Sequence, residues 1–507
     1  MCNSSLDKKP ASRRTTVDSL VHYAQAVPQQ AAYVDELGTV TYAELWAAAQ
    51  RRAAWLASRG VRSGEAVALA FESNAIGARR DLELLYAVAF LGATTLPLFP
   101  DVPQAACVAL IERFAASWLI AGGAPPRVAT ASTLDPRGYD TAAEAGDVAR
   151  GDRPEAGAVY LFTSGTTGAP KVLLPTQAQL HGNVLAAALA VGTDSADRQL
   201  GSIPWPSVVG MRYLLRAHAV GAAFVSAPVG ETREAMGEIL ARFGITRLYL
   251  SPWQLRRLLQ SPVPARPWPA LRSIQVTGAF ISPQEVEQIR SSLSPHLFVS
   301  YGCNELGSAT LLASGETMPE PGCVGRPLPG MEVRVHGAQG EALGPGVTGE
   351  LGFRADWMCT GYVGNPQATR ERFRDGWFYP GDIGSIGADG RVYLRGRQGD
   401  VINYGGLKVW PEDIEAVLKR CPDLADAAVV GLPDPMAGQV PVAFVVARGP
   451  LSPQAVRGFC ATHIEAARIP PHFRVIDSIP RNANGKVLRE FLATHFSVTP
   501  EGVQPKA

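Results

Sequence analysis

Hydroxyl side chains and glycines separate two apolar segments in the stretch Tyr160 to Leu174, YLFTSGTTGAPKVLL. Glycines let backbone amides approach an anion, hydroxyls supply further donors, and a lysine brings a compact positive charge that suits phosphate oxygens. The residues concerned are Thr163, Ser164, Gly165, Thr166, Thr167, Gly168 and Lys171. The stretch is not a Walker loop, because Pro170 precedes the lysine and Val172 follows it. Taken alone, it is equally consistent with a polyphosphate-binding loop and with an ordinary Thr/Gly hairpin turn.

Four further stretches combine glycine turns with charged or aromatic side chains. They are Tyr301 to Gly307 (YGCNELG), Gly376 to Gly384 (GWFYPGDIG), Gly396 to Glu415 (GRQGDVINYGGLKVWPEDIE) and Pro480 to Arg489 (PRNANGKVLR). Each alone is also typical of structure without chemistry: a turn after a strand, an Asx-type turn, a charged connector and a solvated basic turn. The information therefore lies in their occurrence together and in this order.

Before Gly322, apolar runs that predict strands alternate with patterns that predict helices. The expected helices are Thr16 to Ala26, Tyr42 to Arg59, Asp81 to Leu91, Thr176 to Val191 and Thr232 to Phe243. The expected strands include Ala66 to Phe71, Thr94 to Leu98, Leu200 to Ile203, Ala222 to Ser226, Arg247 to Leu250 and Ser273 to Thr277. Such alternation predicts an α/β architecture with parallel sheets covered by helices on both faces. Two βαβ-type sheet subdomains are expected.

From Gly322 the sequence changes to short strands and Gly/Pro turns, which predicts a small β-rich subdomain. After Arg397 a separate α+β module is expected, with a helix at Pro411 to Arg420, acids in its first turn and bases in its last. We therefore predict a large N-terminal domain, residues 1–397, and a small C-terminal domain, residues 398–507.

Size and composition favour a globular protein that acts on small molecules or on other proteins. The chain has 507 residues, 46% of them hydrophobic, and a net charge of +1, which gives no electrostatic footprint for nucleic acid. Seven scattered cysteines without a C-x-x-C pair favour free thiols in a reducing compartment. Neither a secretory signal nor an apolar run long enough for a membrane span is visible, so a cytoplasmic location is expected.

Taken in order, the five stretches resemble the adenylate-forming superfamily of acyl-CoA synthetases, aryl-CoA ligases, peptide-synthetase adenylation domains and luciferases. The resemblance extends from about Thr16 to Phe491, and TSGTTGAPK is its most specific part. It implies a reaction in which a carboxylate attacks the α-phosphate of ATP to give an acyl-adenylate and pyrophosphate. Such an enzyme must position its reactants and neutralise phosphate charge.

The resemblance also implies roles for particular residues. Thr163 to Lys171 would grip the β- and γ-phosphates, while Glu305 and Thr166 would hold Mg²⁺. Tyr301 would stack on adenine, and Asp382 would accept hydrogen bonds from both ribose hydroxyls with Arg397 assisting. Lys486 would bridge the carboxylate and the α-phosphate, which requires the C-terminal domain to fold over the cleft.

In this family the small domain then rotates and presents another face for thioester formation. The pivot corresponds to Gly399, where relatives often carry Asp or Lys. Lys408, Gly405 and Gly406 would face the cleft in that second state, although ordinary turn glycines are an equal alternative for the last two.

Four positions in three stretches depart from the family pattern. Asn304 stands where relatives usually have threonine, although its amide could still donate to the α-phosphate. Pro380 replaces a threonine of the ribose motif and removes a backbone donor. Pro206 and Ser207 occupy the places of a frequent Phe-His pair before the acyl pocket.

The expected acid pocket is apolar and partly aromatic. Its candidate residues are Trp205, Ser207, Val208, Val209, Met211, Gly278, Ala279, Phe280 and Leu306, of which we expect about half to touch substrate and the rest to be core. The absence of an acid between Trp205 and Met211 disfavours α-amino acids, and the bulk of Phe280 favours an aryl or short acyl substrate over a long chain.

The acceptor thiol belongs either to coenzyme A or to the phosphopantetheine arm of an acyl or peptidyl carrier protein. No carrier module follows Lys486 in the sequence, so we expect a stand-alone ligase, with coenzyme A favoured. A non-catalytic nucleotide-binding homologue is the rival class, and Asn304, Ser207 and Gly399 are the residues that would support it.

Overall fold

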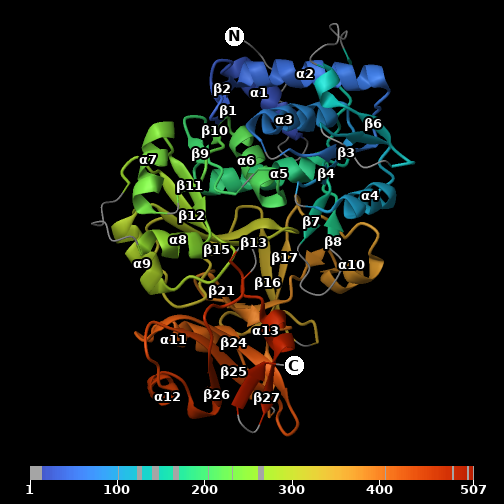
Figure 1. Ribbon diagram of the computed structural model, residues 1–507. Coiled ribbons are helices and arrows are strands. Elements are labelled where there is room, and N and C mark those ends of the chain that lie inside the picture. The colour runs from blue at the N-terminus through green and yellow to red at the C-terminus, as the bar shows by residue number, and fades with distance from the viewer. Residues whose placement is uncertain are drawn as a thin grey trace.

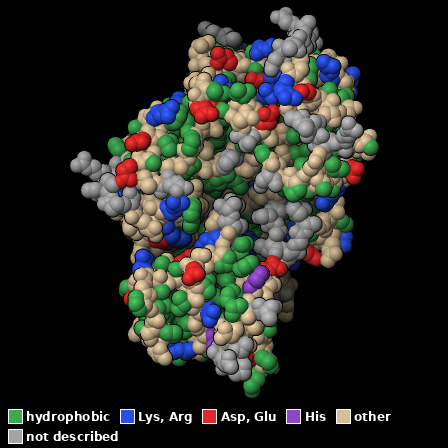
Figure 2. Space-filling model, viewed as in Figure 1, with side chains coloured by type: hydrophobic (Ala, Val, Ile, Leu, Met, Phe, Trp, Pro, Cys, Tyr) green, Lys and Arg blue, Asp and Glu red, His purple; other side chains and the backbone are tan. Residues whose placement is uncertain are grey.

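The computed structural model describes most of the chain (Figure 1). It describes residues 14–72, 74–100, 102–122, 128–139, 148–163, 171–203, 205–230, 232–260, 268–337, 339–405, 407–481, 485–499 and 502–505. On the face shown in Figure 2, basic and acidic side chains are interspersed, as the net charge of +1 leads one to expect. Among the described residues, no helix is both long enough and apolar enough to cross a membrane.

The chain begins with two helices that flank a hairpin, and each helix is defined by its capping residues. They are α1 (Thr16–Ala26), β1 (Ala31–Asp35), β2 (Gly38–Thr41) and α2 (Tyr42–Arg59). The Thr41 side chain accepts from the Glu44 amide in a capping box, and Gly60 ends α2 in the left-handed conformation. Both ends of α2 therefore lie where the sequence predicts them.

The first sheet subdomain has four parallel strands in the order β4-β3-β5-β6. Its elements are β3 (Ala66–Ala70), α3 (Ala75–Phe90), β4 (Thr94–Leu98), α4 (Gln104–Arg113), β5 (Trp118–Ile120) and β6 (Ser132–Leu134). Helix α3 begins six residues before the expected Asp81, because Asn74 caps it by accepting from the Gly77 amide.

The second sheet has nine strands in the order β15-β14-β13-β12-β11-β9-β10-β1-β2, with a parallel centre and antiparallel edges. Its strands after the first hairpin are β9 (Arg198–Leu200), β10 (Ala223–Val225), β11 (Arg247–Leu250), β12 (Ser273–Val276), β13 (Leu297–Cys303), β14 (Gly307–Leu312) and β15 (Arg326–Pro327). The helices are α5 (Gln177–Ala190), α6 (Val208–Ala219), α7 (Arg233–Phe243), α8 (Pro252–Leu259) and α9 (Pro283–Ser292). The candidate site lies where β13 turns into β14.

The β-rich subdomain is an antiparallel sheet. It contains β16 (Glu332–His336), β17 (Gly349–Arg354), α10 (Pro366–Arg372), β18 (Phe373–Arg374), β19 (Trp377–Phe378), β20 (Asp382–Ile386) and β21 (Val392–Arg397). Its core includes the buried Leu306, so this subdomain packs directly under the turn between β13 and β14.

The C-terminal part lies below the rest of the molecule in the view of Figure 1 and has its own core. It contains β22 (Ile402–Tyr404), β23 (Leu407–Val409), α11 (Pro411–Leu418), β24 (Leu424–Asp434), β25 (Gly438–Ala447), α12 (Pro453–Ala461), β26 (His472–Val475), α13 (Arg489–His495), β27 (Phe496–Thr499) and β28 (Gly502–Pro505). Helix α11 ends at Leu418, so the bases expected in its last turn lie beyond the helix. The predicted fold class, an α/β domain followed by a small α+β domain, is confirmed.

Candidate active site

The predicted phosphate loop joins the two strands of a short hairpin, β7 (Leu161–Thr163) and β8 (Lys171–Leu173). The register sets Thr163 opposite Lys171, so the loop begins and ends at one point. Residues Ser164, Gly165, Thr166, Thr167 and Gly168 lie outside the described residues. The Lys171 ammonium lies 5.2 Å from the centre of the Tyr362 ring, which places the end of the loop beside the next element of the site.

The turn that carries Glu305 is held by close backbone packing. A Cβ atom on Gly302 would lie 1.9 Å from the Gly307 carbonyl oxygen, and one on Gly307 would collide with the side chain of Asn183. The Asn183 amide donates to the Leu306 carbonyl at 2.6 Å, which fixes the turn to α5. Glu305 itself accepts a 2.7 Å hydrogen bond from the Tyr362 hydroxyl. Gly302 is thus required by space, and Gly307 by space and by its φ of 67°.

Two polar side chains connect this turn to its surroundings. Arg212 of α6 donates to the Asn304 carbonyl at 2.6 Å. The Asn304 amide donates to the Phe162 carbonyl of β7 at 3.4 Å, so Asn304 joins the turn to the phosphate-loop hairpin. The structure thereby brings Lys171, Asn304 and Glu305 into one region.

Burial and the Glu305 carboxylate shape the acid-base properties of their neighbours. Burial raises the pKa of the Tyr362 hydroxyl, and the negative charge of Glu305 raises it further. The same two causes raise the pKa of the Cys303 thiol. Tyr362 therefore stays a neutral hydrogen-bond donor to Glu305 over the physiological pH range.

The donor set around Glu305 fits Mg²⁺ bound mainly through substrate phosphates. No group of three or more His, Cys, Asp or Glu side chains able to hold a metal occurs in the part of the chain that the structure describes. Mg²⁺ in nucleotide enzymes is commonly held by one or two carboxylates together with phosphate oxygens and water. A single oriented carboxylate such as Glu305 meets that requirement.

Asp382, the predicted ribose ligand, is buried at the start of β20 and is 6% exposed. The Tyr301 hydroxyl donates to one of its oxygens, and Arg397 Nε lies 3.1 Å from the other. Asp382 and Arg397 face each other across β20 and β21. Pro380 lies before β20, so its missing N–H removes no donor from that strand, and the adjacent Gly381 carbonyl accepts from the Gln398 amide at 2.8 Å. The predicted adenosine-binding residues thus form one cluster.

Lys486 reaches the same cluster from the C-terminal domain. Burial lowers the pKa of its ammonium and the positive charge of Arg397 lowers it further, while Asp400 and Asp382 act in the opposite direction. The segment around Lys486 is tied to its own domain by two ion pairs, Arg481 with Asp426 at 2.6 Å and Arg489 with Glu415 at 2.7 Å. The adjacent Gly485 packs on Trp253 of the N-terminal domain, so the structure shows a domain arrangement in which the segment that carries Lys486 lies against that domain.

The residues expected to act in the second state lie elsewhere. Gly399 is in the turn between β21 and β22, and a Cβ atom there would meet nothing within 4 Å. Gly405 has a φ of 59° in the β22–β23 hairpin, and Lys408 is exposed on β23. Gly406 lies outside the described residues.

Some of the predicted acid-pocket residues are buried, and others are partly or fully exposed. Trp205, Val208, Met211 and Leu306 are buried, and the Trp205 ring packs against Phe71 with centroids 5.3 Å apart. Gly278 and Ala279 are exposed, and Phe280 is half-buried at the same rim. Ser207 caps α6 by accepting from the Gly210 amide at 3.1 Å. The structure thus gives Ser207 a capping role that explains its presence.

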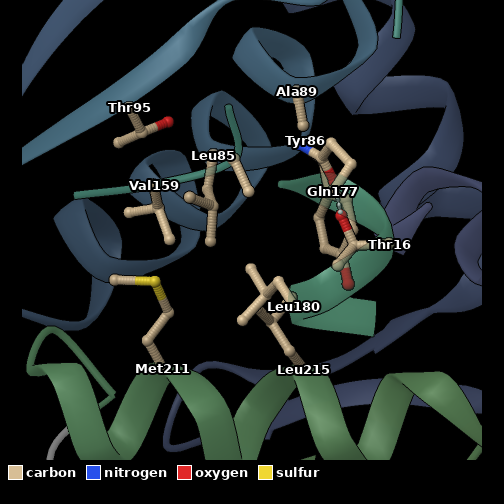
Figure 3. Close-up of a pocket in the computed structure, with 11 residues that line it drawn as sticks. Thr16, Leu85, Tyr86, Ala89, Thr95, Val159, Gln177, Leu180, Met211 and Leu215 are labelled. Carbon is tan, nitrogen blue, oxygen red and sulfur yellow. Dashed lines mark hydrogen bonds between the residues drawn. The ribbon is translucent and has the colours of Figure 1, made fainter. Parts of the chain in front are cut away.

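Met211 points into a small internal cavity between α3, α5 and α6 (Figure 3). The cavity has a volume of about 10 Å³, which is room for about one water molecule. It is lined mostly by apolar side chains, among them Leu85, Leu180 and Leu215. On this side Met211 packs against its neighbours, and the cavity is too small to receive a carboxylic acid substrate.

Sequence reasoning missed three side chains of this region. Tyr362 holds Glu305, and Arg212 holds the Asn304 carbonyl. Tyr213 packs on Tyr249 with ring centroids 3.9 Å apart, next to Thr277 and the open rim. Arg212 and Tyr213 lie on helix α6, and Ser207 before VVGMRYLLRAHA is a typical signal for the start of a helix. No acidic residue follows in the first turn, so that start was not predicted.

The predicted phosphate-loop hairpin, the predicted adenosine-binding cluster and a lysine on a second domain are the features expected of the class of adenylate-forming enzymes. The model of the AMP-binding enzyme family matches residues 20–363, and the model of the AMP-binding enzyme C-terminal domain matches residues 413–486. The chain therefore belongs to the AMP-binding enzyme family.

Three similar proteins indicate which enzymes of this family the chain resembles. The 2-succinylbenzoate–CoA ligase of Geobacillus sp. (strain WCH70) is 28% identical over 485 residues, covering 93% of this chain and 96% of that protein. The fatty acid–[acyl-carrier-protein] ligase ScoC of Streptomyces coeruleorubidus is 29% identical over 530 residues, covering 95% and 96%. O-succinylbenzoate coenzyme A synthetase (MenE) from Bacillus subtilis, solved in complex with ATP and magnesium ion, has a TM-score of 0.83 at 26% identity, covering 94% and 99%.

These findings confirm the predicted enzyme class. The protein is an AMP-forming acid–thiol ligase of the acyl- or aryl-CoA ligase type, and its reaction uses ATP, Mg²⁺ and the thiol of coenzyme A or of a carrier-protein phosphopantetheine.

Proposed function

We propose that this ligase activates an aryl or short- to medium-chain acyl acid as its adenylate and transfers the acyl group to coenzyme A. The observation that carries the adenylation step is geometric: Gly485, next to Lys486, packs on Trp253 of the N-terminal domain, where a Cβ atom would lie 3.2 Å from the Trp253 Cβ atom, while Tyr301 and Arg397 hold Asp382. The charges of Arg397 and Asp382 also act on the Lys486 ammonium. A buried ammonium at this point is suited to the negative charge that develops between a carboxylate and the α-phosphate.

The roles of the other residues follow from their positions. Asp382, oriented by Tyr301 and Arg397, accepts hydrogen bonds from the ribose hydroxyls. Glu305, oriented by Tyr362, holds Mg²⁺ with the substrate phosphates. When bound, the metal neutralises phosphate charge. Lys171 stands at the end of the loop that would enclose the β- and γ-phosphates. The residues before it, Thr163 to Gly168, are proposed to bind the same phosphates.

The size of the acid is inferred from the residues that border the open rim. Tyr213 and Tyr249 form a close pair of rings tilted by 48° beside Thr277, and Phe280 adds a third, half-buried ring in the loop after β12. Arg216 fixes the Tyr213 ring of this pair, because its guanidinium lies over that ring and donates to Gln275 at 2.6 Å. Three rings held in this way favour a flat or short acid over a long acyl chain.

Thioester formation is proposed to follow rotation of the C-terminal domain about Gly399. The position of this glycine supports the proposal, since it lies in the turn between β21 and β22 where a Cβ atom would meet nothing within 4 Å, and glycine can absorb a large change of backbone angles. Lys408 and the glycines Gly405 and Gly406 would then face the thiol. A carrier-protein acceptor remains the second candidate, because ScoC is named for transfer to an acyl carrier protein. We also propose a cytoplasmic location, which the free cysteines among the described residues support.

The experiment is carboxylate-dependent exchange of labelled pyrophosphate into ATP with a panel that includes benzoate, 2-succinylbenzoate, hexanoate and palmitate. Thioester products are then detected by mass spectrometry with coenzyme A or with a holo acyl carrier protein. We expect exchange with the aryl or short acids and thioester formation with coenzyme A. Preference for palmitate would contradict the proposed substrate, and thioester formed only on the carrier would contradict the proposed acceptor.

A further inference from the structure

A large apolar side chain lies exposed on the N-terminal domain where the C-terminal domain approaches. Trp253 is 46% exposed at the second position of α8. The start of this helix is already fixed by Pro252 at its first position and by the capping box of Ser251 and Gln254. The indole is therefore not needed to define the helix, and it belongs to no hydrophobic core of the described residues.

The backbone that carries Lys486 lies directly on this tryptophan. A Cβ atom on Gly485 would be 3.2 Å from the Cβ atom of Trp253, and Gly485 has a φ of 78°. Glycine is therefore required here for its conformation and for the closeness of the contact. The indole is held in place by Arg257 one turn further along α8, whose guanidinium lies 5.0 Å from the ring centre.

A second contact between the domains begins on the same helix. Arg256 of α8 donates to the Phe280 carbonyl at 3.0 Å and pairs with Glu285, which fixes the rim loop to α8 and α9. Lys419, just after α11 of the C-terminal domain, places its ammonium 5.9 Å from the centre of the Phe280 ring. The two domains thus meet at Trp253 and again at Phe280.

Lys419 is also joined to the segment that carries Lys486. Its ammonium lies 3.9 Å from Glu415 Oε2, and Glu415 pairs with Arg489, three residues after Lys486. Only seven of the 47 basic residues of the chain are lysines, and Lys419 is one of four that the structure describes. A compact ammonium at this position, in a chain that otherwise uses arginine, fits a contact of restricted size.

We propose that Trp253, Arg256 and Phe280 form a docking seat for the C-terminal domain, and that Trp253 is a positioning residue for Lys486 in the adenylation step. This proposal rests on the proposed function, in which the same domain leaves the site before thioester formation. The seat then stabilises one of two domain arrangements, because its contacts with Gly485 and Lys419 exist only while Lys486 faces Asp382. It should contribute to the first half-reaction and not to the second.

The test compares the two half-reactions in Trp253→Ala, with benzoate or hexanoate, whichever supports faster exchange in the wild-type enzyme. We expect pyrophosphate exchange to fall about 10- to 100-fold, since small misplacements of a catalytic group have effects of that size. Thioester formation from a chemically prepared acyl-adenylate and coenzyme A should be unchanged. Trp253→Phe should restore most of the exchange, and Lys419→Met should lower it about two- to fivefold.

The matched control is Leu189→Ala, which removes another exposed apolar side chain of the same domain, 62% exposed at the end of α5. It should leave both half-reactions unchanged. Equal losses of both half-reactions in Trp253→Ala, or wild-type exchange in that variant, would overturn the proposal.

A second measurement does not depend on the acid. The rate at which acetic anhydride modifies Lys486 is followed by peptide mass spectrometry in the presence of ATP, where the small number of lysines gives a simple pattern. Modification should be faster in Trp253→Ala than in wild type or Leu189→Ala, because the ammonium loses its shielding. An unchanged rate of Lys486 modification would contradict the proposed docking seat. Absence of pyrophosphate exchange with every acid in the wild-type enzyme would contradict the proposed function alone.

Discussion

Replacing Lys486 by alanine separates the chemistry of adenylation from the binding of ATP. Lys486 is the one residue of the proposed catalytic set that the C-terminal domain supplies, and its neighbours Arg397 and Asp382 belong to the other domain. The substitution removes a positive charge at the proposed point of bond formation. It leaves Asp382 with its partners Tyr301 and Arg397, so the adenosine cluster should remain intact.

The size of the effect follows from the environment of the ammonium. Burial lowers the pKa of Lys486, which shows that its charge is only partly solvated. Two unit charges about 4 Å apart interact by about 4 kcal/mol at an effective dielectric constant near 20. Loss of roughly 3 to 4 kcal/mol of transition-state stabilisation corresponds to a rate lower by about 10²- to 10³-fold.

The assay measures pyrophosphate exchange, ATP affinity and thioester formation from prepared acyl-adenylate in parallel. Exchange should fall by that factor, while ATP affinity and the second half-reaction should change little. Exchange in Lys486→Ala at the wild-type rate would refute the role of this lysine. A loss of ATP binding of the same size as the loss of exchange would refute the separation of chemistry from binding.

The same lysine predicts a pH dependence. The protonated ammonium is the active form, so exchange should decline as pH rises through the pKa of Lys486, and that pKa lies below the ordinary lysine value of about 10.4. In Lys486→Arg the decline should move to higher pH, because a guanidinium stays charged. A decline at the same pH in both enzymes would assign it to another group.

Three further predictions concern the ribose site, the stability of the fold and the acid pocket. Asp382→Asn should weaken ATP binding by about 1.5 to 3 kcal/mol, the value of a hydrogen bond to a charged group, which isothermal titration would detect; unchanged affinity would place the ribose elsewhere. Burial raises the pKa of Asp81 to about 7, above its unfolded value near 3.9, so its contribution to stability is present below pH 4 and is lost as pH rises towards 7, by up to about 1.4 kcal/mol per pH unit. Urea unfolding between pH 4 and 8 should show this slope, and Asp81→Asn should reduce it; identical slopes would contradict the assignment. Trp205→Ala should destabilise the protein by about 3 to 5 kcal/mol, because the ring is 1% exposed and packs on Phe71; wild-type stability in urea would show that Trp205 is not part of the core.

Local signals in the sequence predict much of the fold. Thr41 and Gly60 define α2, Thr176 caps α5, and strands β4 and β11 have the bounds expected from their apolar runs. These features depend on neighbouring residues alone, since capping and strand burial are decided within a few positions. The start of α3 was misplaced because Asn74 caps it before a less apolar turn.

Helix α6 shows why other elements were not predicted. Its buried face includes Arg216, whose charge is satisfied by Gln275 from a distant strand, so the local pattern does not indicate which face is inside. The site has the same limitation. Family resemblance suggests Glu305, Asp382 and Lys486, but the contacts that orient them come from Tyr362, Tyr301 and Arg397, and only the fold brings these together.

The most direct test of the central claim is exchange of labelled pyrophosphate into ATP by the wild-type enzyme, with and without a panel of carboxylic acids, followed by mass detection of the coenzyme A thioester. We predict exchange that depends on an aryl or short acyl acid, and a thioester of that same acid. Exchange that does not depend on any acid of the panel, or no exchange at all, would contradict the assignment of this site to acid adenylation.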